Sequence, residues 1–245
     1  MLSGSGGQIL ALSGVAHVIV DDISTVELSE EDQHHLGTVR RLRSGDSITL
    51  GDGSGGWRTA VLRLREKGRG RKRLGLEFTS EVFSESREEP PIIIGFCLPS
   101  LDRASWALQK MTELGVDRVC LLHSQYSSTR QAGLEEGGRE LVRLQKVMRE
   151  AGMQCRAAFL PRLEPITSLE SFAETYPTCG ACTLGGDSLL ELDTPVAVGP
   201  EGGFTYSELE LFSRKIDLGR NILRSETAAV VVSGVLSLQR AGLLG

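Results

Sequence analysis

The sequence lacks a long apolar run and has few aromatic residues. No segment of the 245 residues is long and apolar enough to span a bilayer, which argues against a membrane protein. The modestly apolar stretch from Ile9 to Val20 follows no basic region and is interrupted by His17, so a secretory signal peptide is not expected. We therefore expect a cytoplasmic protein with no membrane partner.

Metal ligands and paired cysteines are also scarce. The five cysteines are odd in number and scattered along the chain, which is typical of buried reduced thiols rather than of a disulfide framework. Cys179 and Cys182 alone have CxxC spacing, and no nearby Cys or His pair supplies the two further ligands that zinc would need. We predict core thiols and no metal site.

An excess of positive charge is missing too, because the formal net charge is −5. This argues against a protein that coats nucleic acid with its whole surface, although a local basic patch on an acidic body stays possible. With 40% hydrophobic residues the chain can bury a full core, as one large domain or two modest ones.

The first eighty or so residues contain short alternating runs separated by turns rich in Asp, Gly and Ser. These runs are predicted strands of a small β-barrel: His17–Val20, Ser47–Leu50, Trp57–Leu62 and Leu74–Phe78. One helix is predicted between the first two strands, near Ser29 to Arg43, because Ser29 is a suitable N-cap and acidic residues follow it.

The charged segment from Ser84 to Pro91 ends in prolines and is predicted to link two domains, residues 1–86 and 87–245. Beyond it, strand-like apolar runs alternate with helical patterns, which favours an α/β domain with a mostly parallel sheet. The predicted strands are Ile92–Phe96, Arg118–Leu122, Cys179–Leu184 and Pro195–Gly199. The predicted helices are Asp102–Leu114, Gly138–Gly152 and Thr205–Ile216.

The last segment, Glu226 to Leu244, is apolar on all sides. Val230 to Val232 favour a strand, whereas the length and overall apolar character favour a buried helix, which is our prediction.

A run of basic residues between Arg63 and Arg73 contains a single acid. Together with Arg40, Arg41 and Arg43 it could displace counterions from phosphates, whereas the alternative is a solvated hairpin tip. Because so many like charges repel each other without an anionic partner, we favour nucleic acid. The predicted RNA-binding residues are Arg41, Arg63, Arg65, Lys67, Arg69, Arg71, Lys72 and Arg73.

A glycine-rich loop, Gly199-Pro200-Glu201-Gly202-Gly203-Phe204, follows a predicted strand. It should lie at the carboxyl edge of the sheet, where α/β proteins bind ligands. It lacks the Lys-Ser/Thr ending of a P-loop and the spacing of a dinucleotide fingerprint, so a neutral or cationic nucleoside is favoured. A phosphate cradle and a plain tight turn remain alternatives.

A second segment, Leu218 to Ala228, combines apolar and charged residues. Leu218, Ile222 and Leu223 could line a flat pocket beside Arg224 and Glu226. Arg224 and Glu226 could equally form a structural ion pair at a helix start, where the N-terminal dipole favours the carboxylate.

Taken in order, five segments resemble the ribosomal RNA small subunit methyltransferase E family, a member of the SPOUT superfamily of S-adenosylmethionine-dependent RNA methyltransferases. The first is the spaced set His35, Val39, Arg41, Gly45 and Asp46. The others are Gln109–Val116, Glu150–Arg156, Gly199–Phe204 and Leu218–Ala228. Two positions depart from the family pattern, because Ser100 replaces a usual lysine and Tyr126 a usual arginine.

The resemblance implies a PUA-like β-barrel followed by a SPOUT domain whose C-terminal part forms a trefoil knot. It also implies a homodimer, with the knot and the last helix at the interface, acting on small-subunit ribosomal RNA or an assembled 30S-type particle. The implied reaction is methylation of one uridine at N3, with S-adenosylmethionine as the donor.

On this hypothesis Arg224 stabilises developing charge, and Glu201 or Glu226 positions it or accepts the proton. The predicted cofactor contacts are Leu184, Gly199, Glu201, Gly202, Leu218, Ile222 and Leu223. Two alternatives stay open: an enzyme of the same superfamily that methylates a ribose 2′-hydroxyl or another base, and an RNA-binding assembly factor without activity.

Overall fold

The computed structural model describes residues 15–25, 28–34, 36–37, 42–67, 71–127, 132–187 and 189–244. The chain divides into two compact units. The first contains residues up to Arg87 together with Gly152–Phe159, and the second contains Glu88–Ala151 and Leu160–Gly245.

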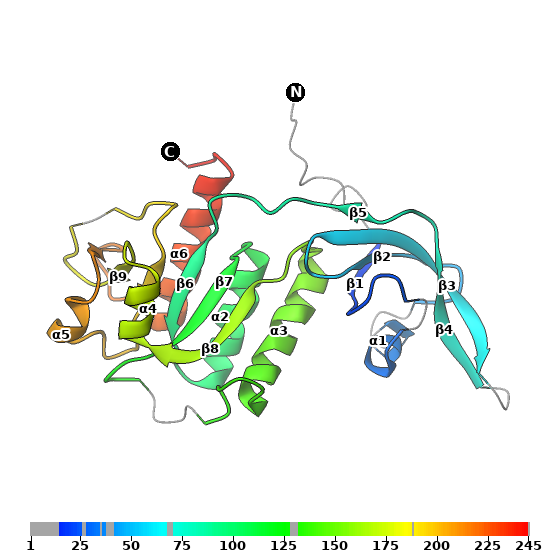
Figure 1. The fold of residues 1–245 in the computed structure, drawn as a ribbon, viewed down its shortest axis with the longest axis horizontal. Coiled ribbons are helices and arrows are strands. Elements are labelled where there is room, and N and C mark those ends of the chain that lie inside the picture. The colour runs from blue at the N-terminus through cyan, green and yellow to red at the C-terminus, as the bar shows by residue number, and fades with distance from the viewer. Residues whose placement is uncertain are drawn as a thin grey trace. The chain divides into compact units, whose positions relative to one another are not determined.

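The first unit is built on one sheet (Figure 1). Its strands are β1 (Ala16–Ile19), β2 (Ser47–Gly51), β3 (Gly56–Lys67), β4 (Arg71–Phe78) and β5 (Phe83–Ser84). β1 pairs with β2 in parallel, whereas β3 runs antiparallel to β2, β4 and β5. The predicted strands of this region are confirmed, and β3 and β4 extend further than predicted into the basic hairpin.

Alternate residues of these strands form the core of the first unit. Ile48, Leu50 and Leu62 are fully buried. Trp57 stacks on Phe83 with ring centroids 4.6 Å apart, so the short β5 is anchored by an aromatic contact.

The predicted helix after Ser29 begins as expected but is short within the described residues. In α1 (Glu30–His34) the backbone N–H of Asp32 donates to Ser29 Oγ over 3.0 Å, which is an N-cap contact. Much of the remaining prediction, to Arg43, lies outside the described residues.

The second unit contains a parallel sheet in the order β11-β9-β10-β6-β7-β8. The strands are β6 (Ile93–Cys97), β7 (Arg118–His123), β8 (Arg162–Ser168), β9 (Gly180–Cys182), β10 (Val196–Val198) and β11 (Arg214–Ile216). The central strands are buried on both faces, as their continuous apolar runs predict.

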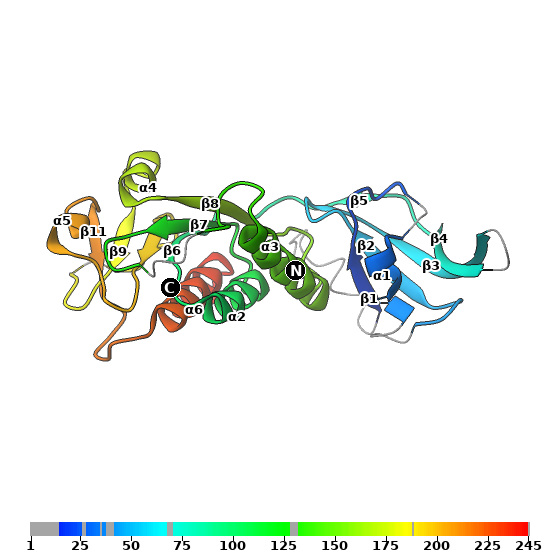
Figure 2. The same ribbon diagram turned by 90° about the horizontal axis from the view of Figure 1, so that it is seen from below.

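Residues of these strands point to opposite faces of the sheet and contribute to two separate hydrophobic cores. Ile94 and Phe96 point to a core shared with α2 (Leu101–Glu113), α3 (Arg139–Cys155) and α6 (Ser225–Arg240). Cys97 belongs to the opposite core with α4 (Leu169–Thr175). Figure 2 shows α2 and α6 on one side of the sheet and α4 on the other. The predicted α/β domain with a mostly parallel sheet is confirmed.

Two predictions in this unit need correction. The region Thr205–Ile216 is not one helix, since it forms the single-turn α5 (Tyr206–Leu209) and then the edge strand β11. Strand β8 and helix α4 were not predicted at all. The ambiguous last segment is helical, as predicted, from Ser225 to Arg240.

The Gln109–Val116 motif forms the last turns of α2 and a sharp stop. Lys110 Nζ lies 2.8 Å from both carboxylate oxygens of Glu113, and Gly115 adopts a left-handed φ of 74°. The buried guanidinium of Arg240, at the end of α6, contacts the Asp117 carboxylate and donates to the Gly115 carbonyl over 2.6 Å. The motif therefore holds α6 against α2.

The Glu150–Arg156 motif ends α3. Arg156 follows the helix with a left-handed φ of 58°, which is unusual for a residue other than glycine. Its Nη2 donates to the Val15 carbonyl over 2.6 Å, and this bond fixes the start of β1 within the first unit.

Among the described helices, none has both the length and the apolar character needed to cross a membrane.

Candidate functional site

A cavity of about 300 Å³, called here the loop cavity, lies at the carboxyl ends of β9, β10 and β11. The loops that follow these three strands supply its walls, together with the start of α6. The lining residues are Cys182, Thr183, Leu184, Val198–Phe204, Asp217–Gly219, Asn221–Leu223, Ser225 and Ala228. This is the sheet edge that the sequence predicted for the glycine-rich loop.

The loop Gly199–Phe204 needs its glycines for different reasons. A Cβ on Gly199 would lie 3.1 Å from the Phe204 ring, and one on Gly202 would lie 3.0 Å from Tyr126 Cβ. Gly203 has a φ of 73°, and its N–H donates to the Pro200 carbonyl over 2.9 Å to close the turn. The main chain can therefore approach the cavity closely.

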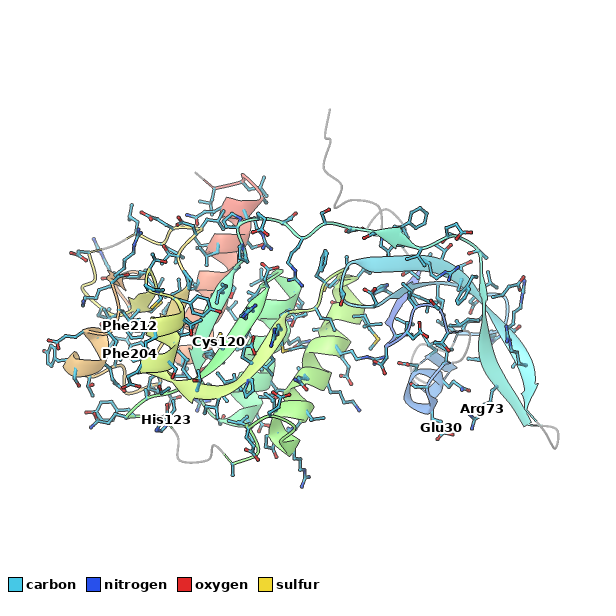
Figure 3. The ribbon with its side chains drawn as sticks, in the orientation of Figure 1. Glu30, Arg73, Cys120, His123, Phe204 and Phe212 are labelled. Carbon is cyan, nitrogen blue, oxygen red and sulfur yellow. The ribbon has the colours of Figure 1, made fainter. Side chains whose placement is uncertain are left out.

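Aromatic packing and a capping box hold the end of this loop. Phe204 packs on Phe212 with ring centroids 5.5 Å apart (Figure 3). Thr205 caps α5 in a box with Glu208, whose other carboxylate oxygen accepts the Gln125 N–H over 2.7 Å. Glu208 thus ties the loop after β7 to the loop after β10.

Asp217 connects the other two loops. Its carboxylate accepts the Gly185 N–H after β9 and the Gly219 N–H after β11, each over 2.9 Å. Neither Asp217 nor Glu208 was predicted from the sequence. No sequence signal indicated Asp217, because the segment before it, Thr205–Ile216, was predicted to be a helix rather than to end in the strand β11.

All seven predicted cofactor contacts line the loop cavity. These residues are Leu184, Gly199, Glu201, Gly202, Leu218, Ile222 and Leu223. Ile222 is 81% exposed, so a large apolar side chain stands in solvent at the cavity rim. A single cavity therefore contains both segments that the sequence singled out, and their role toward a ligand stays a prediction.

Two further hollows lie near the loop cavity, and one of them shares lining residues with it. The bridging hollow, about 350 Å³, is lined by Arg103, Glu201, Ile222, Leu223 and Arg224. The α2–α6 hollow, about 400 Å³, is lined by Arg103, Trp106, Arg224, Glu226 and Thr227. The predicted catalytic residues are thus brought to adjoining spaces, since Glu201 lines the first and Glu226 the second, with Arg224 lining both.

Arg103 on α2 is the cation that sequence reasoning missed. It forms an ion pair with Glu201, and its Nε lies 4.0 Å from Glu226 Oε1. Glu226 therefore pairs with Arg103 rather than with Arg224, in contrast to the structural ion pair considered above. Arg103 and Glu201 are far apart in the sequence, and no local pattern connects them.

Glu226 is the unusual group of this site. Glu226 is only 7% exposed, and its Oε2 atom has no hydrogen-bond partner within the described part of the chain. A buried polar atom left without a partner costs about 1–3 kcal/mol, and more when it is charged. The position of Glu226 in the first turn of α6 offsets part of this cost through the helix dipole.

The basic run forms the far end of the β3–β4 hairpin. Across the antiparallel strands β3 and β4, Lys67 lies opposite Arg71, and Arg65 lies opposite Arg73. Arg63 forms an ion pair with Glu77, Arg73 forms one with Glu30 at 2.7 Å (Figure 3), and Arg65 Nη2 donates to the Leu76 carbonyl over 2.7 Å. Carboxylates thus partly neutralise the run. Arg41 and Arg69 lie outside the described residues, as do the side chains of Lys67, Arg71 and Lys72.

The cysteines are all free thiols. Burial raises the pKa of Cys182, in the loop cavity, to about 12, so this thiol stays protonated and poorly nucleophilic at neutral pH. Across the described ranges, no three Cys, His, Asp or Glu residues gather in a way that could hold a metal ion.

The family model described as "RNA methyltransferase domain" matches residues 87–237. The chain belongs to this RNA methyltransferase family. A second model, "RNA methyltransferase PUA domain", matches residues 28–69 of the same methyltransferase.

Relatives of this RNA methyltransferase carry the family name that the motifs indicated. Over 239 residues it is 28% identical to the ribosomal RNA small subunit methyltransferase E of Mycobacterium tuberculosis, covering 89% of this chain and 88% of the relative. Over 253 residues it is 25% identical to the Bacillus subtilis protein of the same name, covering 92% and 94%. The resemblance stated above is confirmed.

Solved structures agree with the fold. The ribosomal RNA small subunit methyltransferase E of Neisseria gonorrhoeae, bound to S-adenosyl methionine, matches with a TM-score of 0.75 and 25% identity over 92% of this chain and 97% of that one. A probable rRNA-methyltransferase from Porphyromonas gingivalis matches with a TM-score of 0.78 and 23% identity over 93% and 99%.

The two departures from the family pattern occupy different places in this methyltransferase. Ser100 is the N-cap of α2, but its side chain makes no cap hydrogen bond. Tyr126 is 54% exposed and lies against Gly202 in the glycine-rich loop. An aromatic ring therefore stands beside the loop cavity where the family pattern has a cation.

Proposed function

We propose that this RNA methyltransferase transfers a methyl group from S-adenosylmethionine to N3 of a uridine in small-subunit ribosomal RNA. The observation that carries the proposal is the convergence of Gly199–Phe204 and Leu218–Ala228 on one cavity in a chain of this family. The names of the relatives support the RNA substrate, and the bound relative supports the donor.

The loop cavity suits an adenosine-containing donor with a positive charge. Leu218, Leu223 and Val198 offer apolar walls, while the close-approaching main chain of the glycine-rich loop offers hydrogen-bonding groups. The carboxylates of Glu201 and Asp217 line the same space and would favour a cation. When bound, S-adenosylmethionine supplies an electrophilic methyl group on a sulfonium sulfur. The seven predicted contact residues would hold it.

The protein's task in the reaction is to position uracil and to manage one proton. N3 must approach the methyl carbon in line with the carbon–sulfur bond, which a fixed pocket provides. N3 becomes nucleophilic as its imide proton passes to a carboxylate, Glu226 or Glu201. The new N–C bond then forms with the electron pair left on N3, and the carbon–sulfur pair stays on sulfur. Arg224 would stabilise the negative charge that develops on the uracil oxygens.

The first unit is proposed to bind the RNA. We assign residues 1–86 to a PUA-like β-barrel and residues 87–245 to the methyltransferase domain. The two family matches, within residues 28–69 and 87–237, support this division, and the five-stranded sheet of the first unit is compatible with a barrel. The basic residues from Arg63 to Arg73, with Arg41, would contact phosphates.

Further parts of the proposal concern the assembled protein. We assign a trefoil knot to the C-terminal part, in which α6 returns to pack on β6 and β10 after the chain has reached the edge strand β11. We assign a homodimer because Val231 and Leu238 stay exposed on the face of α6 away from its core. The substrate, rRNA or a 30S-type particle, places the enzyme in the cytoplasm.

The Arg224→Ala variant tests the catalytic assignment. We expect methyl transfer to small-subunit RNA or particles to fall at least about a hundredfold, because a charge-stabilising donor is removed, while donor binding changes little. Isothermal calorimetry measures the binding, and mass spectrometry of the RNA identifies the modified atom. Near-normal turnover, or a methyl group on a ribose oxygen, would contradict the proposal.

A further inference from the structure

The α2–α6 hollow is not explained by donor binding. It shares Arg103 and Arg224 with the bridging hollow, which in turn shares Glu201, Ile222 and Leu223 with the loop cavity. The bridging hollow therefore connects the other two spaces. A molecule in the α2–α6 hollow could meet a reactive group presented from the loop cavity.

We propose that the α2–α6 hollow is the pocket for the target uracil, with Glu226 reading its N3–H, Arg103 and Arg224 reading its two oxygens, and Trp106 stacking on its face. The proposal rests on the proposed function and extends it to two residues, Arg103 and Trp106, that no motif indicated.

The groups that line the hollow complement the hydrogen-bonding pattern of uracil. Its Watson–Crick edge presents an acceptor, a donor and an acceptor, namely O2, N3–H and O4. The complement is a donor, an acceptor and a donor. The hollow is lined by two guanidinium groups and one carboxylate, which are the groups that can supply this complement.

Glu226 provides an independent reason to expect a ligand. Its Oε1 lies 4.0 Å from Arg103, but the buried Oε2 has no hydrogen-bond donor among the described residues. Native structures rarely leave such an atom unpaired, and an imide N–H would satisfy it. The same contact would carry the proton away from N3, so the recognition of uracil and its activation would use one group.

Trp106 supplies the second kind of contact. Trp106 lines the hollow and is 46% exposed, so part of its aromatic surface is accessible to a ligand. Enzymes that modify a base bring it out of the stack and hold it between aromatic or apolar groups. A stacked base is worth roughly tenfold to a hundredfold in affinity, whatever its identity.

The arrangement also predicts discrimination against cytosine. Cytosine presents a lone pair at N3 and an amino group at C4, so the carboxylate of Glu226 would face an acceptor and one guanidinium would face a donor. The pocket should therefore reject cytosine while the stacking on Trp106 is kept.

Inhibition by mononucleotides tests the pocket, with methyl transfer to small-subunit RNA measured at saturating S-adenosylmethionine. We expect uridine monophosphate to inhibit competitively with RNA, and cytidine monophosphate to be at least about tenfold weaker. In the Glu226→Gln variant the amide can donate to cytosine N3, so the residual activity should show a smaller preference for uridine monophosphate. In the Trp106→Ala variant, both nucleotides should inhibit about tenfold or more weakly than in the wild type. Val142→Ala, at an exposed apolar position on α3, is the matched control.

The outcomes separate the pocket from the proposed function. If the wild type methylates uridine N3 but the two nucleotides inhibit equally or not at all, the pocket is wrong and the function stands. If S-adenosylmethionine does not bind or N3 is not the product, the function itself is wrong. If Trp106→Ala changes the oligomeric state in light scattering without changing inhibition, Trp106 belongs to an interface and its stacking role is overturned.

Discussion

At the scale of single residues, the glycines of the glycine-rich loop serve two different needs: space for neighbouring side chains, and a left-handed backbone conformation. Gly199 and Gly202 leave room for Phe204 and Tyr126, whereas Gly203 has open space around the position of a Cβ and is needed for its left-handed backbone. Gly137, near the start of α3, has nearly the same φ, 71° against 73°, and equally open space. The two positions therefore form a matched pair.

We predict that Gly203→Ala and Gly137→Ala lose similar stability, about 1 kcal/mol each, from the same backbone strain. Only Gly203→Ala should weaken S-adenosylmethionine binding, because only Gly203 lines the loop cavity. Thermal unfolding and calorimetry measure the two effects. Equal donor affinity in both variants would mean that the loop conformation does not contribute to binding.

His17 gives a pH-dependent prediction at the same scale. Burial lowers its pKa from 6.5 to about 4, and its Nδ1 lies 2.9 Å from Thr49 Oγ1. Since the unfolded chain binds the proton first, stability is lost as pH falls from about 6.5 toward 4. The loss attributable to His17 at pH 5 should be about 2 kcal/mol relative to pH 8.

The comparison variant is His17→Gln, which cannot titrate there. The stability difference between the wild type and the variant should shrink between pH 8 and pH 5. Urea unfolding, with hydrogen exchange of β1 and β2 as the local probe, measures it. Parallel pH curves for the two proteins would contradict the assignment.

At the scale of elements, Arg240 attaches the end of α6 to the loop between α2 and β7. Its side chain is 8% exposed and that of Asp117 is 10% exposed, so the contact joins two buried charges. Arg240 Nε also lies 3.1 Å from the exposed carboxylate of Glu88. We predict that Arg240→Ala destabilises the second unit by about 3–5 kcal/mol, because the buried carboxylate of Asp117 loses the cation beside it.

Arg143→Ala is the control for this prediction. Arg143 also pairs with an acid, Asp102, but their side chains are 53% and 92% exposed, and such pairs contribute less than about 1 kcal/mol. Chemical denaturation measures both variants. A loss in Arg240→Ala no larger than in Arg143→Ala would show that α6 is held by its apolar core alone.

The elements also show where the sequence was informative. Buried strands such as Ile93–Cys97 and amphipathic helices such as Leu101–Glu113 followed directly from their apolar periodicity. The predicted helix Thr205–Ile216 was wrong for two reasons. Glu208 uses both carboxylate oxygens to hold neighbouring loops, and Arg214–Ile216 forms a strand only because it pairs with β9. Such long-range pairing has no local signal.

The residues of the candidate site also divide into those with a local sequence signal and those that depend on long-range packing. Two of the three loops of the loop cavity were singled out from the sequence: Gly199–Phe204 by its glycines and proline after a predicted strand, and Leu218–Ala228 by its combination of apolar and charged residues. Arg103 and Trp106 were not, because a helix residue gains a role here only when α6, more than a hundred positions later, packs beside α2. The buried state of Glu226 is likewise a product of that packing.

At the scale of the whole molecule, net charge opposes RNA binding while one local surface favours it. The chain carries −5, yet β3 and β4 concentrate cations at one hairpin end. We predict that Arg71→Glu with Arg73→Glu weakens RNA binding and lowers the slope of log affinity against log salt. The slope should fall by roughly 0.7 for each phosphate of a single strand that the hairpin no longer neutralises.

The charge-matched control is Arg139→Glu with Arg143→Glu on α3, at two exposed positions of the second unit. Filter binding across a salt series measures RNA affinity, and calorimetry checks that donor affinity is unchanged. Equal slopes for the two double variants would assign RNA binding elsewhere, and loss of donor binding in the hairpin variant would indicate misfolding.

The order in which the loop cavity is assembled has a consequence for synthesis on the ribosome. Its last wall, Asp217 to Ala228, is translated after the other walls of the cavity, and α6 must then pack beside strands made much earlier. A nascent or truncated polypeptide ending before this wall would have a folded hairpin for RNA but no place for the methyl donor. Premature termination should therefore yield a competitor for the substrate, not a weak enzyme.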